Sequence, residues 1–143
     1  MTENLKLKGI FTLNIFENDS LREAFVDNNL VVNVGRESLA HLLAGDGVDK
    51  QITKIQFGTS GAAKTVDDTE ITDPFTKAIG VVEYPEINSV LFNFTLLVSE
   101  DNGASIQEFG LVSEDLTLFA RITRATIEKT DTLRLEGTWK IIF

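Results

Sequence analysis

The sequence contains no cysteine. Structural disulfides and thiolate zinc sites are therefore excluded, so the fold must be held together by packing and hydrogen bonds. At 143 residues the chain is long enough for this, because a domain of such a size buries roughly two-thirds of the surface of its unfolded chain. We expect a single domain over residues 1–143, with no metal and no cofactor.

Positive charge is scarce. The chain has 13 Lys and Arg against 22 Asp and Glu, which gives a formal net charge of −9 and a pI near 4.5. Binding to nucleic acid depends on cations that neutralise phosphates, so we exclude it as the main activity. The charge balance predicts a soluble chain whose copies repel one another.

Long apolar runs are also missing. No run approaches the roughly 20 residues that a membrane helix requires, and the first residues lack the apolar segment of a signal peptide. We therefore expect no membrane partner. Tyr and Trp occur once each, against ten Phe. Recognition surfaces are enriched in Tyr and Trp, so this aromatic set indicates buried apolar surface instead.

The most regular pattern present lies in the last third of the chain. From Leu133 to Phe143 apolar and polar residues alternate almost without a break, which is typical of a strand with one face in a core. Together with the other strand patterns, this predicts a mainly β fold, an antiparallel β-sandwich or meander. The expected core residues are Phe92, Phe109, Leu111, Phe119, Trp139 and Phe143.

The remaining elements follow from local patterns. We expect strands at residues 9–17, 21–26, 52–59, 75–84, 89–98, 105–112, 118–125 and 132–143. One short helix is expected over residues 36–44, where Leu39, Leu42 and Leu43 make an apolar stripe that should pack against the sheet. Gly45 is its expected C-terminal cap.

The first strands predict an N-terminal β-hairpin within residues 1–28, around the turn at residues 18–20. An isolated hairpin is marginally stable, so this one must pack either on its own chain or on a neighbouring subunit. The sequence leaves both possibilities open. Apolar hairpin residues should not stay bare, so the contact residues that we predict are Ile10, Phe11, Leu13, Ile15 and Phe16.

Residues 58–65 nearly fit a phosphate-binding loop. The pattern needs Gly directly before Lys64, because backbone amides must wrap closely around a phosphate, but Ala63 stands there. The surrounding chain also predicts antiparallel strands instead of alternating strands and helices. We therefore favour a surface loop and keep a small NTPase as a minor hypothesis.

No other pattern indicates catalysis. His41 is the sole histidine, and the acidic clusters lack the ligand spacing of a calcium-binding loop. Glu108 lies inside an apolar strand, so we expect it to be partly buried and paired with Arg121 or Arg124. We predict no catalytic residue, no metal site and no enzymatic activity.

Four stretches of the sequence belong together: residues 29–45, residues 52–59, residues 106–112 with 118–121, and residues 129–131 with 139–143. They contain, in this order, an I-x-E-x-G-L strand, a turn, an L-F-A strand and a final W-x-I-x-F strand. In this the chain resembles small tail proteins of tailed bacteriophages and the particle-proximal domain of tail-collar and tail-fibre proteins, in which these motifs recur in the same order.

The resemblance implies a non-enzymatic structural or adaptor component of a phage tail, in the baseplate, collar or fibre-attachment region. It implies other virion tail proteins as partners, a trimer or ring of copies, and a place in the virion tail after assembly in the host cytoplasm. Fibre proteins continue into a shaft and tip, whereas this sequence stops at Phe143, so we expect an adaptor. The alternative is a carbohydrate- or ligand-binding β-sandwich module.

Overall fold

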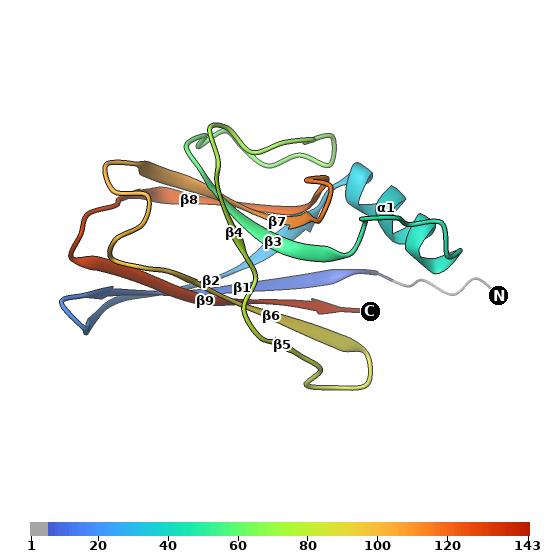
Figure 1. Ribbon diagram of the computed structural model, residues 1–143, viewed down its shortest axis with the longest axis horizontal. Coiled ribbons are helices and arrows are strands. Elements are labelled where there is room, and N and C mark those ends of the chain that lie inside the picture. The colour runs from blue at the N-terminus through green and yellow to red at the C-terminus, as the bar shows by residue number, and fades with distance from the viewer. Residues whose placement is uncertain (1–5) are drawn as a thin grey trace.

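The computed structural model describes residues 6–143 and contains one antiparallel sheet of nine strands and one short helix, α1 (Asn33–Leu43) (Figure 1). The strands are β1 (Lys8–Glu17), β2 (Ser20–Val31), β3 (Ile52–Gly58), β4 (Phe75–Ala78), β5 (Val82–Glu83), β6 (Ser89–Leu96), β7 (Ser105–Ser113), β8 (Leu118–Glu128) and β9 (Leu133–Ile142). The predicted mainly β, antiparallel fold with one short helix and an N-terminal hairpin is confirmed.

The strand order is β4-β3-β7-β8-β2-β1-β9-β6-β5. The sheet curls into a half-barrel, so that β3, β7 and β8 lie over β1, β9 and β6 (Figure 1). Strand β2 joins these two halves. Most of β2 pairs with β1, whereas only Leu30 and Val31 pair with β8.

The two outermost strands, β4 and β5, belong to one continuous segment. β4 pairs with β3 in one half of the sheet, and β5 pairs with β6 in the other. The crossing between them is bonded to both halves, because Ile79 N–H donates to Thr53 O (2.9 Å) and Gly80 N–H donates to Asn93 O (2.8 Å). This crossing divides into two the strand that the sequence predicts over residues 75–84.

Aromatic rings from both halves of the sheet meet in the core. The ring centroid of Phe11 on β1 lies 4.9 Å from that of Phe109 on β7 and 4.9 Å from that of Trp139 on β9. Such ring pairs stabilise a core beyond the area that they bury. The predicted core residues that lie here, each at most 7% exposed, are Phe92, Phe109, Leu111, Phe119 and Trp139.

Phe143 departs from this pattern and corrects the predicted core. Strand β9 ends at Ile142, and the side chain of Phe143 is 49% exposed. The pairing of β9 with its neighbours ends at Lys8 and Ser89, both opposite Ile142. The alternation places Phe143 on the core side, but no paired strand residue lies beyond Ile142 to cover it.

The N-terminal hairpin packs on its own chain. β1 pairs with β9 along its full length, and its residues Phe11, Leu13 and Ile15 are at most 3% exposed in the core. The prediction that these three residues contact another subunit is thereby corrected, because their side chains face the inside of the curl. Ile10 and Phe16 lie on the outer face and are half-buried. Residues 1–5 of the predicted hairpin region lie outside the described residues.

Helix α1 docks through small residues near its beginning. Gly35 and Ser38 are its buried residues, and a Cβ added at Gly35 would lie 2.4 Å from the backbone oxygen of Phe119. Only glycine allows the helix to approach β8 so closely. The helix runs from Asn33 to Leu43 instead of the predicted 36–44, and its C-cap residue is Ala44. The predicted cap, Gly45, follows directly with a φ of 74°. Among the described residues there is no helix both long and apolar enough to span a membrane.

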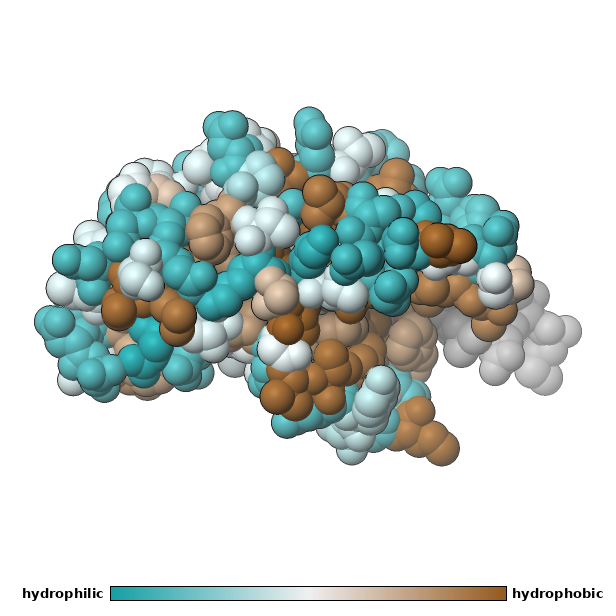
Figure 2. Space-filling model, viewed as in Figure 1, coloured by the Kyte–Doolittle hydropathy of each residue, from teal (hydrophilic) through white to brown (hydrophobic). Residues whose placement is uncertain are grey.

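The predicted packing of the apolar stripe of α1 is wrong for two of its three leucines. Leu39 packs partly against the core, but Leu42 is 37% exposed and Leu43 is 91% exposed. Because the helix is anchored near its N-terminal end, its last turn extends past the sheet. Figure 2 shows apolar surface next to α1 at this end of the molecule.

Candidate functional site

The loop that resembles a phosphate-binding loop does not have the geometry of one. No helix follows Gly58 before β4 begins, so no helix N-terminus faces the loop. The amine of Lys64 donates to Asn28 O (2.8 Å) and lies 3.8 Å from the carboxylate of Asp27. Lys64 thus attaches the loop to β2.

Residues 59–74, which we call the strap, are fastened to the sheet by Glu108. This carboxylate, 1% exposed, accepts hydrogen bonds from the N–H groups of Ser60 (2.8 Å) and Thr72 (3.0 Å) and from Arg121 Nε (2.9 Å). Arg121 also donates to Asp68 (3.0 Å). The predicted pairing of Glu108 with Arg121 is present, and both carboxylate oxygens of Glu108 are engaged.

Two further contacts hold the strap in place. Ile71 is buried over Gly110, where an added Cβ would lie 2.6 Å from its Cγ1. Burial opposes the ionisation of Asp68, but hydrogen bonds from Thr65 and Arg121 hold the pKa of this carboxyl below its ordinary value. Lys64, Asp68 and Ile71 thus hold the strap against the sheet.

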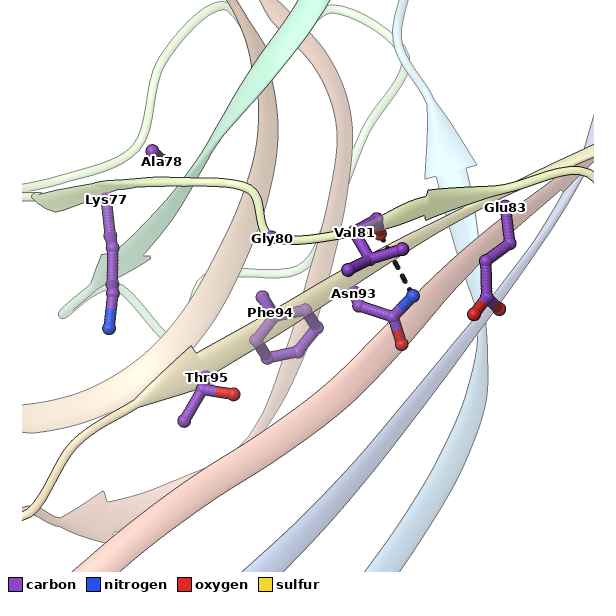
Figure 3. Close-up of a pocket in the computed structure, with 8 residues that line it drawn as sticks. All are labelled: Lys77, Ala78, Gly80, Val81, Glu83, Asn93, Phe94 and Thr95. Atoms are coloured by element: carbon purple, nitrogen blue, oxygen red, sulfur yellow. Dashed lines mark hydrogen bonds between the residues drawn. The ribbon is translucent and has the colours of Figure 1, made fainter.

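A hollow of about 500 Å³ lies where the β4–β5 crossing passes over β6 (Figure 3). The amide of Asn93 donates to Val81 O (3.0 Å), and Lys77 is bound by Glu100 (2.6 Å). The one ring that lines it, Phe94, is 3% exposed, so no open ring face is offered to a sugar. The lining residues are Lys77, Ala78, Gly80, Val81, Glu83, Asn93, Phe94 and Thr95.

His41 and the acidic clusters do not form a metal centre. The histidine Nδ1 lies 3.3 Å from the carboxylate of Asp46, and its Nε2 lies 4.0 Å from that of Glu37. Among residues 6–143 no group of three or more His, Asp or Glu side chains could hold a metal ion. His41 therefore belongs to an exposed ion-pair cluster on the surface of α1.

The end of the molecule that carries α1 has an apolar hollow of about 340 Å³, which we call the end hollow. Its walls include Leu43, 91% exposed, and Phe143, 49% exposed. Soluble monomers seldom leave large apolar side chains gathered in water, and such a patch typically marks an interaction site. The lining residues are Lys6, Leu7, Leu39, Leu43 and Phe143.

The end of β5 and its connection to β6 project beside the end hollow. We call residues 83–88, which comprise the last residue of β5 and this connection, the finger. Asn88 Nδ2 donates to Phe143 O (3.1 Å), and Phe143 N–H donates to Asn88 O (2.9 Å). The base of the finger is thus bonded to a wall of the hollow. On the finger Ile87 is 106% exposed and Tyr84 is 77% exposed, and Figure 2 shows apolar surface at its tip.

Cations without a carboxylate partner gather at this same end. Within residues 6–143, only Lys6, Lys8, Arg36 and Lys129 lack a carboxylate within 4.0 Å. Lys129 is buried and donates to three oxygen atoms, so it is satisfied internally. The other three are exposed.

Two of these three cations border the end hollow. Lys6 lines it. Arg36 precedes Leu39 by one turn of α1 and therefore shares its face of the helix. Lys8 pairs with Ile142 on the outer face of the sheet, whereas Phe143 lies on the other face, so Lys8 points away from the hollow. We call the end hollow, the finger, Lys6 and Arg36 the end surface.

Sequence patterns do not reveal the end surface. They place Phe143 and the leucine stripe in the core, and they cannot show which cations lack partners, because the partners of most others are distant in the chain. Lys50, for example, binds Asp115 at 2.7 Å. A local signal is Ile87, an apolar residue between the predicted strands 75–84 and 89–98.

No protein-family model, no curated protein and no solved structure matches the chain. What this protein does is therefore inferred from its own residues and their geometry.

Proposed function

We propose that this chain is a non-enzymatic structural subunit of a bacteriophage tail, in the baseplate, the collar or the fibre-attachment region. It acts by assembling with other virion tail proteins and with copies of itself. The end surface is the observation that carries this proposal. It combines exposed apolar side chains with cations that have no described carboxylate partner, a composition suited to protein–protein contact.

Several of the residues behind the resemblance to phage tail proteins are core residues in this structure, although Phe143 is not. Ile106, Glu108 and Leu111 of β7, Leu118 of β8 and Trp139 of β9 are at most 1% exposed. They pack the two halves of the sheet and hold the strap. A likeness carried by core residues supports a shared architecture, which is what a tail subunit would share with its relatives.

The side chains that would suggest an enzyme have structural partners. Glu108 is bound by two backbone N–H groups and Arg121, and Lys64 is bound to β2. A nucleophile needs a base within hydrogen-bond reach and a third group that orients the base. The contacts of His41, with two exposed carboxylates, do not include a nucleophile. These observations favour an architectural role.

Immunogold labelling tests the proposal. Antibodies raised against the purified chain are applied to phage particles recovered from the encoding bacterium, with antiserum pre-absorbed on the chain as the control. We expect gold at one fixed position on the tail. Unlabelled particles from a lysate that contains the free chain, or labelling confined to the head, would overturn the assignment.

A glycan array tests the alternative of a carbohydrate-binding module. Reproducible binding to one class of sugar, lost in Tyr84→Ala, would favour that alternative, since Tyr84 is 77% exposed and aromatic faces are common at sugar sites. We expect no binding above that of the Tyr84→Ala control, because the hollow of Figure 3 presents no open ring face.

A further inference from the structure

We infer that the end surface binds a second copy of this chain, with Ile87 on the finger of each copy entering the end hollow of the other. The inference rests on the proposed function, since it names the first partner in assembly. It can nevertheless be tested, and can fail, independently of any location in a virion.

The tip of the finger and the end hollow both present apolar side chains. Ile87 projects from the finger with its side chain fully in water. The end hollow is lined by the apolar side chains of Leu7, Leu39, Leu43 and Phe143. Transfer of an exposed Ile side chain into such a site removes apolar surface from water on both partners, which is the main driving force of association.

Opposite charges are present on the two features. The finger carries Glu83, which has no ion pair with a described residue, and Glu86, which already pairs with Lys140 of its own chain (2.9 Å). The end hollow is bordered by Lys6 and Arg36. Two chains of net charge −9 repel in most orientations. Contact of Glu83 with the basic border is an orientation in which the local charges attract, and such charges fix register.

The placement of the two features favours a two-fold dimer. The finger and the end hollow adjoin at one end of the molecule, because Asn88 and Phe143 are hydrogen-bonded to each other. In a dimer with a two-fold axis, the finger of each copy can then enter the end hollow of the other copy. The same surface is used on both copies, so no further copy can add to it. The dimer is the unit from which a larger tail assembly is built.

Introduced cysteines test the contact on a chain that has none of its own. A tagged Leu43→Cys chain is mixed with an untagged Ile87→Cys chain under mild oxidation and analysed on a non-reducing gel. We expect a covalent heterodimer of one tagged and one untagged chain. The matched control pairs Ile87→Cys with Val26→Cys, which is 65% exposed on β2, and it should give no heterodimer above background.

Solution mass tests the same contact without a crosslink. Light scattering over a dilution series should show a mass of two chains at high concentration. Ile87→Ser and Arg36→Glu should each raise the dissociation constant at least tenfold, whereas Val26→Ser should leave it unchanged. Each substitution is at an exposed position, and circular dichroism verifies the fold of each variant.

Three results would overturn the inference. One is a monomer at every concentration up to the millimolar range. Another is a dimer that tolerates Ile87→Ser but dissociates in Val26→Ser, and the third is equal crosslinking of Leu43→Cys and Val26→Cys. If the dimer tests fail but immunogold labels the tail, the proposed function stands and this inference falls. If the dimer forms but the tail is not labelled, only the assignment to the virion falls.

Discussion

Trp139 and Phe143 occupy equivalent positions in the alternation of residues 133–143, yet Trp139 is 0% exposed and Phe143 is 49% exposed. The difference lies in their neighbours. Trp139 is flanked by Phe11 on β1 and Phe92 on β6, whereas Phe143 lies beyond the last paired residue. Burial at a single position therefore depends on strands that are far away in the chain.

Truncation of these two side chains should have unequal effects. We expect Trp139→Ala to lower the free energy of unfolding by about 3–5 kcal/mol, because it removes a large buried side chain and leaves a cavity. Phe143→Ala, at a half-exposed site, should cost less than about 1 kcal/mol. Chemical denaturation followed by circular dichroism measures both. Similar losses in the two variants would contradict this placement of Phe143.

At the residue scale the sequence predicts which face a side chain occupies, but not whether that face is covered. The alternation correctly assigns Leu135, Trp139 and Ile141 to the core side of β9. The same rule fails for Phe143 and, on the helix, for Leu43, because cover is supplied by other elements. Both failures lie on the end surface, where an exposed apolar residue is available to a partner.

Among the elements, the strap shows how one buried carboxylate can organise a long loop. Glu108 lies on β7, and one of its oxygens, Oε2, accepts hydrogen bonds from the N–H groups of Ser60 and Thr72 at the two ends of the strap. Arg121 on β8 balances its charge. A buried charge without a partner of opposite charge destabilises the folded state, so the burial of Glu108 and that of Arg121 depend on each other.

Removal of this carboxylate should loosen the strap. We expect Glu108→Ala to destabilise the fold by about 3–5 kcal/mol, because buried Arg121 keeps only Asp68 as a carboxylate partner and the N–H groups of Ser60 and Thr72 lose their acceptor. Hydrogen exchange should show lost protection at the amides of Ser60 and Thr72. Glu114→Ala is the control, since Glu114 makes an exposed ion pair with Lys54, and it should cost at most about 1 kcal/mol. Unchanged exchange at Ser60 would disprove this role of Glu108.

Most strands could be predicted from the sequence because their signals are local. The alternation and the polar turns are properties of adjacent residues, such as Asn18 and Asp19, whose φ values of 49° and 66° suit a tight hairpin turn. The division of residues 75–84 could not be predicted. It depends on hydrogen bonds from Ile79 and Gly80 to two strands distant in the chain.

For the whole molecule, the arrangement of charges makes stability depend on pH. Hydrogen bonds from Lys50 and Ser113 hold the pKa of Asp115 well below its ordinary value. A carboxyl whose pKa is lowered by folding stabilises the protein above its unfolded pKa, about 4, and this stabilisation is lost as the pH falls through the folded pKa. Other carboxyls whose pKa is lowered are Glu23, Asp68, Glu86 and Glu100.

Acid should therefore unfold the protein progressively. We expect the melting temperature to be nearly constant from pH 7 to about pH 5 and to fall steeply below about pH 4. Asp115→Asn should make that fall shallower. Glu70→Gln, which replaces an exposed strap carboxylate that has no ion pair with a described residue, serves as the control. Thermal melts at a series of pH values measure the effect, and a melting temperature that rises below pH 4 would be inconsistent with it.

The order of strands in the sheet could not be predicted from the sequence. The first and last strands, β1 and β9, pair along their full length, and β2 joins the two halves through Leu30 and Val31 alone. Pairings between distant strands depend on which apolar faces fit together. The end surface could not be predicted for the same reason. It brings together Leu7, residues of α1, the finger and Phe143, which are far apart in the chain.

The pairing of β1 with β9 has a mechanical consequence. Lys8 lies directly opposite Ile142 at one end of the paired strands. A tensile load applied between these two residues therefore breaks the backbone hydrogen bonds between β1 and β9 one pair after another. A load applied at opposite ends of the two strands would instead act on all of the backbone hydrogen bonds between them at once. The same pair of strands should therefore resist force much better in that direction.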